Sequence, residues 1–256
     1  MLIFIAEAKT MISDEREITP KEFEVHAPAL GQRADEVMAR LAEMSVGEIA
    51  SLTGLGPSLA ARLFKYAYDF PDKRLGYPAI EAFTGVVFKA LDYTSLSAEA
   101  KERCDSDVRI ISSLYGWLQP SDIIKPYRLD YTSRLPQGDY AVTVNQFWRK
   151  DVTIRLLKEL KDSGHNEILN LLPGDAAKLV DWKLVKNFAK VWKADFTDVI
   201  TKATPSASKL KDMRGRLLRQ ILEEGIPDAA TLTRISSESF LCEGTPVYPD
   251  HLHFLC

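Results

Sequence analysis

The sequence predicts a mixed α+β fold built as a single body, and three observations support this expectation. Hydrophobic residues make up 46% of the 256-residue chain and charged residues 27%, which are ordinary values for a globular protein with a sizeable core. Segments with helical spacing of apolar residues alternate with short strand-like runs. Because no repeat or linker-like stretch divides the chain, we expect one domain over 1–256 with a helical insert at about 28–70.

The first six residues, Met1 to Ala6, form an apolar run that predicts a buried strand. The run is too short to cross a bilayer, and it lacks a basic leader before Glu7 and Lys9. We therefore expect a cytoplasmic protein. The chain has three cysteines that lie far apart in the sequence, which favours reduced thiols over a disulfide framework.

The segment 28–70 has a helical pattern in three parts. Apolar residues recur at helical spacing in the first part. Ser45 and Glu48 have the spacing of a capping box, which predicts the start of a second helix. A third helix is expected from Pro57 to about Asp69.

The rest of the chain is predicted to alternate strands and helices. Strand-like runs lie at 79–83, 108–114, 140–144 and 167–172, with two more between 189 and 201 and a final pair at 239–242 and 247–254. Helices fit 94–104, 146–163 and 206–224. Many strand pairings would be non-local, as in a mixed α and β body.

The turn Gly54-Leu55-Gly56 between the second and third predicted helices is the most informative stretch. Glycine adopts positive φ without steric cost, and Pro57 fits the first turn of a helix. Such a turn exposes backbone N–H groups at a helix N-terminus, which favours a DNA phosphate whatever the base. The stretch resembles the helix-hairpin-helix motif of DNA-repair proteins; the alternative is a plain glycine turn. The predicted phosphate-binding set of this element also includes Ser58, Arg62 and Lys65.

Further segments are similar to the YaaA peroxide-stress family. Residues 8–10 match the end of its N-terminal Ser-Pro-Ala-Lys-Thr signature, and 83–88 look like its Phe-x-Gly-x-Val-Tyr stretch. The longest match is 109–116, with further matching positions at Leu118, Pro120, Asp122, 126–129, 146–148, 170–171, Lys211, 214–215, Arg219, 237–238 and Phe240. The matching positions span nearly the whole chain.

The resemblance implies a body of unusual topology that carries a helix-hairpin-helix element beside a positively charged cleft. The family binds duplex and branched DNA and protects cells during hydrogen peroxide stress, when iron chemistry damages DNA. We therefore expect a monomer that binds DNA backbones without reading sequence and that needs no cofactor, metal or membrane. The net charge of −3 requires any basic surface to be local.

The sequence departs from the family pattern at several positions. Ala6 and Glu7 replace the Ser-Pro of the signature, and a Ser-x-Glu-Tyr segment of the family is replaced in part by Pro173 and Ala176. Gln119 stands where the family has an arginine. Two hydroxyl groups and one positive charge are thereby lost. Their loss puts in doubt any chemistry that needs these groups, and it affects phosphate binding by the backbone less.

Candidate cationic residues occur near the first strand and in a central loop. Lys9 follows the carboxyl end of that strand, where ligand crevices often lie, and is expected to contact phosphate or to act as a nucleophilic amine. Lys125 and Arg128 are also predicted to bind phosphate, with Arg128 able to do so through two donors. The alternatives are that Lys9 is a plain surface lysine and that Arg128 pairs with Asp122 or Asp130.

Five positive residues lie on the predicted helix 206–224. At about 100° per residue, three of them gather on one side, namely Lys211, Arg214 and Arg219. We interpret this face as DNA-facing; the alternative is a solvated helix surface. The full set is Lys209, Lys211, Arg214, Arg216 and Arg219.

A few single residues bear on metal binding and on base stacking. His251 and His253 alternate on a predicted strand and could share one ion with Cys256, but no second ligand pair with suitable spacing occurs, so we expect no metal. Trp117 is the tryptophan expected to stack on a base.

These features favour a DNA-binding protein without catalytic activity. The alternative is an enzyme that acts on a nucleobase or nucleotide, with Lys9 as the nucleophile and Tyr127 or Asp175 handling protons. Iron sequestration is a third hypothesis, which the scarcity of clustered His, Cys and carboxylate residues disfavours.

Overall fold

The computed structural model describes residues 1–12, 17–72, 75–236, 240–242 and 250–255. Within these residues, seven strands form one sheet with the order β10-β11-β9-β8-β1-β3-β4. The strands are β1 (Leu2–Ala6), β3 (Val108–Ser112), β4 (Gly116–Leu118), β8 (Glu167–Asn170), β9 (Lys190–Thr197), β10 (Leu241–Cys242) and β11 (His251–Leu255). The predicted mixed α and β fold is confirmed.

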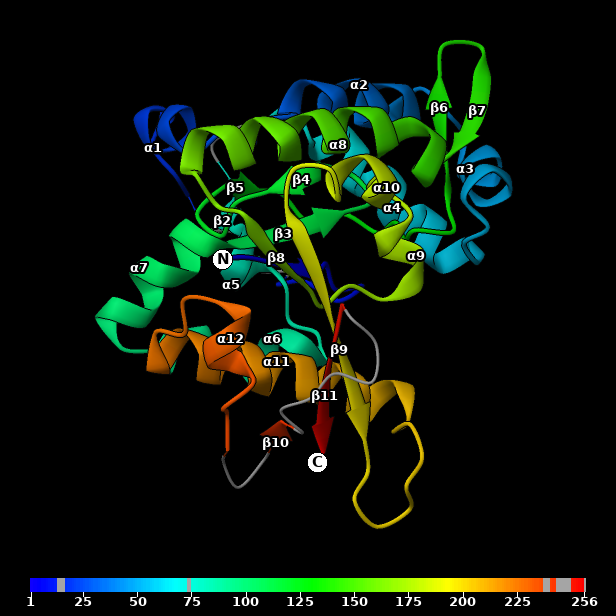
Figure 1. The fold of residues 1–256 in the computed structure, drawn as a ribbon. Helices are drawn as coiled ribbons and strands as arrows, with labels where there is room; N and C mark the ends of the chain where they lie inside the picture. Colours follow the sequence, from blue (N-terminus) through cyan, green and yellow to red (C-terminus); the bar gives the residue numbers. More distant parts are fainter. Residues whose placement is uncertain (13–16, 73–74, 237–239, 243–249, 256) are drawn as a thin grey trace.

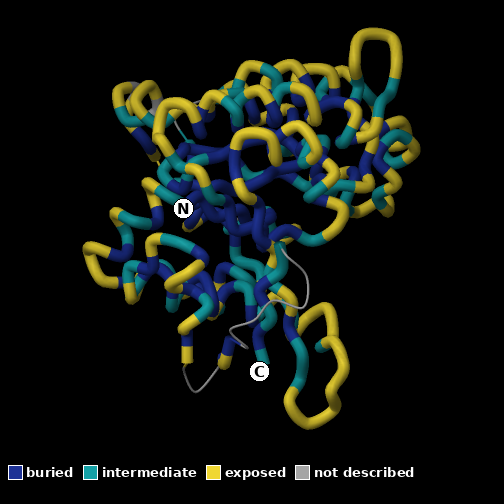
Figure 2. Tube along the Cα trace, in the orientation of Figure 1, coloured by how far each residue is buried: buried dark blue, intermediate teal, exposed yellow. Residues whose placement is uncertain are grey.

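Strand β1 lies in the middle of this sheet because it is apolar on both faces. It pairs in parallel with β3 on one side and with β8 on the other, and β9 and β11 continue the parallel arrangement. Every residue of β1 is buried, as a parallel strand covered on both faces requires. The short strands β4 and β10 pair antiparallel at the two edges. Figure 2 shows the middle of the sheet as a buried region.

Helices cover both faces of the sheet (Figure 1). On one side lie α2 (Gly31–Ala42) and α8 (Val144–Ser163), and on the other lie α6 (Val86–Leu91), α11 (Ala207–Glu224) and α12 (Ala229–Leu232). The remaining elements are α1 (Pro20–Val25), β2 (Tyr77–Pro78), α5 (Ala79–Ala82), η1 (Tyr93–Ser95), α7 (Ala98–Asp107), β5 (Ile123–Ile124), β6 (Arg134–Gln137), β7 (Tyr140–Thr143), α9 (Gly174–Ala177) and α10 (Trp182–Val185).

The segment predicted as helical, 28–70, forms α2, α3 (Val46–Thr53) and α4 (Pro57–Asp69). The predicted capping box is present, because Ser45 Oγ accepts the Glu48 amide at 3.3 Å and Glu48 Oε2 accepts the Ser45 amide at 2.8 Å. Apolar side chains of α2 and α4 belong to the same buried core as the sheet. This packing fixes α4 and therefore fixes the turn that precedes it.

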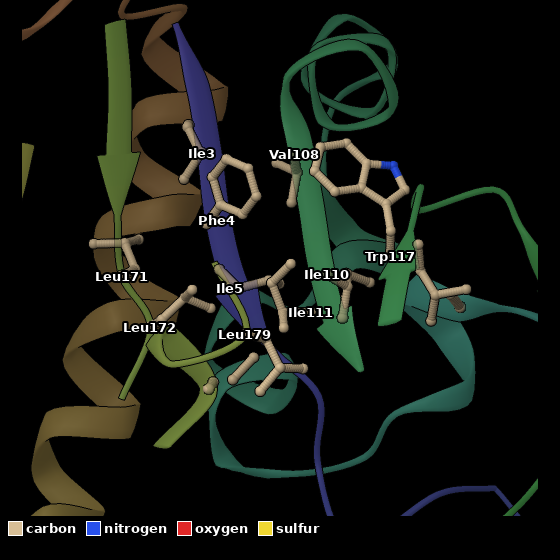
Figure 3. Close-up of a cluster of buried hydrophobic side chains, with 14 of the residues drawn as sticks. Ile3, Phe4, Ile5, Val108, Ile110, Ile111, Trp117, Leu171, Leu172 and Leu179 are labelled. Carbon is tan, nitrogen blue, oxygen red and sulfur yellow. The ribbon is translucent and has the colours of Figure 1, made fainter. Parts of the chain in front are cut away.

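The core around β1 is shown in Figure 3. Phe4 meets the indole of Trp117 edge to face, with 5.5 Å between ring centroids. Trp117 is completely buried, with 0% of its surface exposed. The prediction that this indole stacks on a base is therefore wrong, because the residue serves as a core side chain on β4.

Some predicted strands differ from the observed elements. The segment 79–83 was expected as a strand, but residues Ala79–Ala82 form the short helix α5, whose first two amides donate to the carbonyl oxygens of Asp122 and Pro120. The two strands expected between 189 and 201 are one strand, β9, which ends where Asp198 accepts the amide hydrogens of Ile200 and Thr201. Residues 239 and 247–249 of the last two predicted strands lie outside the described residues. The described parts of both runs contain the strands β10 and β11, which pair antiparallel.

Among the described residues, none of the helices has both the length and the apolar composition that crossing a bilayer requires.

Candidate functional site

A cavity of about 410 Å³ lies at the carboxyl end of β1, and we call it the strand-end pocket. The residues after β8 and the first turn of α6 also contribute to its walls. Open α/β sheets bind ligands at this edge of their parallel strands. The pocket is lined by Ile5, Ala6, Glu7, Ala8, Lys9, Thr10, Gly85, Val86, Val87, Phe88, Asp130, Tyr131, Leu171, Pro173, Asp175, Lys211 and Arg214.

Glu7, the first residue after β1, is held in the pocket by groups from a distant loop. Its Oε2 accepts the amide hydrogen of Ser113 at 2.9 Å and the phenol hydrogen of Tyr127. The Tyr127 oxygen in turn lies 2.8 Å from Ser112 Oγ. On the backbone side, the Glu7 amide donates to the hydroxyl of Tyr131 at 3.2 Å. The carboxyl is therefore fixed by several partners rather than free to rotate.

Burial raises the pKa of the Glu7 carboxyl to about 7, although the hydrogen bonds from Ser113 and Tyr127 act in the opposite direction. Burial together with the adjacent Glu7 also raises the pKa of Tyr127 well above its ordinary value. Glu7 can therefore exchange a proton close to neutral pH, whereas Tyr127 stays a neutral donor. Glu7 was not among the predicted site residues. The signal that could have identified it is its position as a charged residue directly after a fully apolar strand.

Lys9 lines the pocket, as its place after the first strand predicted. Its Nζ donates to Asp130 Oδ2 at 2.8 Å, and the lysine side chain is 63% exposed. Burial alone would raise the pKa of Asp130, but hydrogen bonds from Lys9 and Thr132 outweigh it and lower the pKa to about 2. Lys9 is thus a paired hydrogen-bond donor here, which gives no support to the hypothesis of a free amine nucleophile.

Helix α11 brings two of its five cationic residues to the pocket. Lys211 and Arg214 line it, and within the described part of the chain neither has an acidic partner. Burial lowers the pKa of Arg214, which nevertheless stays charged. This wall carries two positive charges that no acidic side chain of the described residues neutralises, so it is suited to hold a negatively charged group.

The other three cations of α11 are engaged within the protein. Lys209 pairs with Asp198 at 2.9 Å, and Arg216 pairs with Asp212 at 2.8 Å. Arg219 Nη1 donates to the carbonyl oxygen of Leu91, the last residue of α6, at 2.8 Å. The predicted grouping of Lys211, Arg214 and Arg219 on one face is thus divided, because Arg219 binds the end of α6 instead of facing the pocket.

Lys125 takes a structural position in place of the predicted phosphate contact. It is 7% exposed, and its Nζ donates to the carbonyl oxygens of Phe70 at 3.1 Å and Asp72 at 2.8 Å and to that of Asp69. These carbonyls lie at and after the C-terminal end of α4, where helices leave acceptors without partners. The ammonium group therefore supplies hydrogen bonds to the carbonyl oxygens at the end of α4 and points away from solvent.

The neighbouring Arg128 is half-buried and donates to the carbonyl oxygen of Leu129 at 3.2 Å. The proposed pairing with Asp122 or Asp130 is not formed among the described residues, because Asp122 accepts the Gln119 amide and Asp130 pairs with Lys9. Tyr127 is buried and acts through Glu7 rather than directly on the pocket. Asp175 lines the pocket and is paired with Lys178 at 2.8 Å.

The turn between α3 and α4 is exposed to solvent at Gly54 and Gly56. Gly54 ends α3 with φ of 73°, a conformation that glycine adopts without strain, and its amide donates to the carbonyl of Ala50 at 2.9 Å. No acceptor for the amides of Gly56, Ser58 and Leu59 is found among the described residues. The first turn of α4 therefore presents free N–H groups to solvent.

Side chains near this turn are engaged with their own helix. Arg62 lies over the ring of Tyr66, 5.8 Å from its centroid, and Lys65 pairs with Asp69 at 2.6 Å. Neither the turn nor these two residues line the strand-end pocket. The structure thus has two separate places suited to an anion, the start of α4 and the cationic wall of the pocket.

The histidines on β11 belong to a second cavity of about 380 Å³. His251 Nδ1 lies 2.5 Å from Asp195 Oδ2, and His253 Nε2 lies 2.7 Å from Thr197 Oγ1. Among the residues that the structure describes, no group of three His, Cys, Asp or Glu side chains is arranged to hold a metal ion. Cys256, the third ligand considered from the sequence, lies outside the described residues.

Comparison with known proteins gives a match over nearly the whole chain. The model of the family described as peroxide stress protein YaaA matches residues 1–244. A UPF0246 protein of Bacteroides fragilis is 30% identical over 244 residues, covering 94% of this chain and 92% of the relative. UPF0246 proteins of Parabacteroides distasonis and Shewanella woodyi are each 28% identical, over 249 and 253 residues, covering 94% and 95% of this chain and 93% and 94% of the relatives.

Proposed function

The chain belongs to the peroxide stress protein YaaA family, and from this premise we propose that it acts in resistance to hydrogen peroxide by binding DNA backbones without reading their sequence. Family membership supports the role in peroxide stress. DNA is the partner that we infer from the chemistry of the exposed groups. Bound protein would shield the backbone from damage driven by iron and peroxide.

The observation that carries this proposal is the exposed start of α4. Three amide hydrogens at Gly56, Ser58 and Leu59 have no intramolecular acceptor among the described residues, and the helix dipole adds partial positive charge there. A phosphate group satisfies both features at once and carries no base identity. The exposed glycines keep side chains away from the approaching backbone, since a Cβ at either position would meet nothing within 4 Å. These features support the proposal that the turn acts as a helix-hairpin-helix element.

The test is a fluorescence anisotropy titration of labelled duplex and branched DNA with wild-type protein and with Ser58→Glu. Ser58 is the second residue of α4, where a carboxylate interacts favourably with the helix dipole, so the variant is expected to fold. The same carboxylate would repel a phosphate at this position. We expect affinity for both DNA forms to fall about tenfold or more.

The matched control is Ala230→Glu, which places the same charge at the exposed second position of α12. We expect this variant to bind DNA like the wild type. Equal binding by wild type and Ser58→Glu would contradict the role of the α4 start. Absence of salt-sensitive DNA binding by the wild type would contradict the proposed function as a whole.

A further inference from the structure

The strand-end pocket has unbalanced charge on one wall. Its two aspartates are neutralised locally, because Asp130 pairs with Lys9 and Asp175 pairs with Lys178. Lys211 and Arg214, by contrast, have no acidic partner in the described part of the chain. Two neighbouring donors of this kind bind phosphate strongly, and arginine can do so with two parallel hydrogen bonds.

Helix α11 is held in position to present these cations. Gly215 follows Arg214 directly, and a Cβ there would lie 2.7 Å from the Cβ of Ala90 on α6. The two helices therefore touch through backbone at Gly215, and α6 itself begins in the pocket wall at Val86. Lys211 and Arg214, one turn apart on α11, reach the same cavity because this close contact fixes the helix.

A second polar group in the pocket is the carboxyl of Glu7. Its Oε2 accepts hydrogen bonds from the amide of Ser113 and the phenol of Tyr127, and hydrogen bonds from the Ser113 and Ser112 side chains also lower the pKa of this carboxyl. A carboxylate has about four lone-pair sites on its two oxygens, so it can accept a further hydrogen bond from a ligand beside these partners. It can accept a hydrogen bond from a ring N–H or amino group when ionised and can donate one when protonated.

The walls around these polar groups are largely apolar. Ile5, Val87, Phe88 and Leu171 all line the cavity, and Tyr131 adds an aromatic ring. The volume of about 410 Å³ lies in the range of about 300–1,000 Å³ that small-molecule sites occupy. Flat apolar groups with polar edges suit such walls, because rings can pack on Phe88 or Tyr131 while their edges reach Glu7.

We propose that the strand-end pocket binds one nucleotide unit, with its phosphate on Lys211 and Arg214 and its base edge on Glu7. The unit has two possible sources with the same chemistry, a free nucleoside monophosphate or an unpaired nucleotide at a DNA end. The second source rests on the proposed function, and the first does not.

The test is isothermal titration of the full chain with the four deoxynucleoside monophosphates, the corresponding nucleosides and deoxyribose 5-phosphate. We expect at least one nucleotide to bind, and removal of its phosphate or the double substitution Lys211→Ala/Arg214→Ala to weaken binding about tenfold or more. Glu7→Leu should lower the affinity for that nucleotide until it approaches the affinity for deoxyribose 5-phosphate, which has no base. The matched control is Lys209→Ala/Arg216→Ala on the same helix, which should bind like the wild type.

Two results would overturn the nucleotide site. One is absence of binding by all four nucleotides at millimolar concentration. The other is equal binding by the wild type and Lys211→Ala/Arg214→Ala, with circular dichroism confirming that the variant is folded. A competition experiment identifies the source of the nucleotide unit. If the unit comes from DNA, free nucleotide should displace DNA that has an unpaired terminal nucleotide. If the unit is a free nucleotide, that DNA should stay bound.

Failure of this site is distinguishable from failure of the proposed function. Ser58→Glu changes the start of α4, which does not line the pocket, so it should lose DNA binding and retain nucleotide binding. If the wild-type protein binds nucleotides but no DNA, the result contradicts the proposed function and leaves the nucleotide site supported. If it binds DNA but no nucleotide, the result contradicts only the nucleotide site.

Discussion

The phenol of Tyr127 donates a hydrogen bond to the carboxyl of Glu7, a residue 120 positions earlier in the chain. This contact joins the central loop to the carboxyl end of β1 and forms part of the polar group that borders the strand-end pocket. Because burial of Glu7 is only partly compensated by its hydrogen bonds, the contact has consequences for stability as well as for binding.

Glu7→Gln should change the pH dependence of stability. The folded pKa of Glu7 is raised from 4.5 to about 7, so between these values the folded state binds a proton that the unfolded state releases. Wild-type stability should therefore fall as pH rises from about 5 to 7, by up to about 3 kcal/mol from this group. Glutamine remains uncharged and can still accept the Ser113 and Tyr127 hydrogens, so the variant should lack this loss.

The measurement is urea unfolding of wild type and Glu7→Gln at pH 5 and pH 8. The unfolding free energy of Glu7→Gln minus that of the wild type should be larger at pH 8 than at pH 5. Asp122, whose pKa burial also raises to about 7, contributes a similar slope to both proteins and cancels in the comparison. An identical difference at the two pH values would contradict the assignment.

Lys125→Met should destabilise the fold by about 2–4 kcal/mol. The substitution keeps the aliphatic stem but removes the donors that Asp69, Phe70 and Asp72 carbonyls accept at the end of α4, and it leaves buried acceptors without partners. Lys65→Met is the control, since that lysine is exposed and its ion pair with Asp69 is a surface pair. Thermal and urea unfolding should show a change below about 0.5 kcal/mol for the control, and similar losses for both variants would refute a structural role specific to Lys125.

Gly215→Ala should weaken the packing of α11 on α6 by about 1–3 kcal/mol, because the added methyl overlaps the carbonyl of Val87 and presses on Ala90. Gly47→Ala is a matched control in α3, where the nearest atom would be Ser45 Oγ at 4.0 Å. That change should instead stabilise by about 0.5–1 kcal/mol, since alanine favours helix. Calorimetric melting of both variants checks the signs, and a stabilised Gly215→Ala would mean that the two helices are not in contact.

Salt dependence should separate the two classes of cation on α11. Each phosphate contact contributes about 0.9 to the slope of log K against log salt for duplex DNA. If Lys211 and Arg214 contact the backbone of a bound duplex, their joint replacement by alanine should reduce the magnitude of the slope by about 2. Lys209 and Arg216 already pair with Asp198 and Asp212, so their replacement should leave it nearly unchanged. Anisotropy titrations at several salt concentrations provide the slopes, and equal reductions in both variants would contradict this distinction.

Much of the fold followed from local sequence rules, because those rules depend on neighbouring residues. The buried first strand, the capping box of Ser45 and Glu48, and the start of α4 at Pro57 were all predicted where they occur. The short helix α5 was mistaken for a strand because its conformation depends on long-range hydrogen bonds to the carbonyls of Pro120 and Asp122. The single strand β9 was predicted as two, because the turn at Asp198 is a side-chain effect that hydrophobic pattern does not record.

The sequence by itself determined the family, the mixed fold, the exposed glycine turn and the presence of a cationic helix, since each depends on residue order or on spacing along one element. Only the tertiary structure decided which cations are available. Lys125 and Arg219 are bound to carbonyl oxygens of distant segments, whereas Lys211 and Arg214 meet Glu7 at one cavity. The physical reason is that the charge state and availability of a side chain are set by its partners, and here those partners come from segments far apart in the chain.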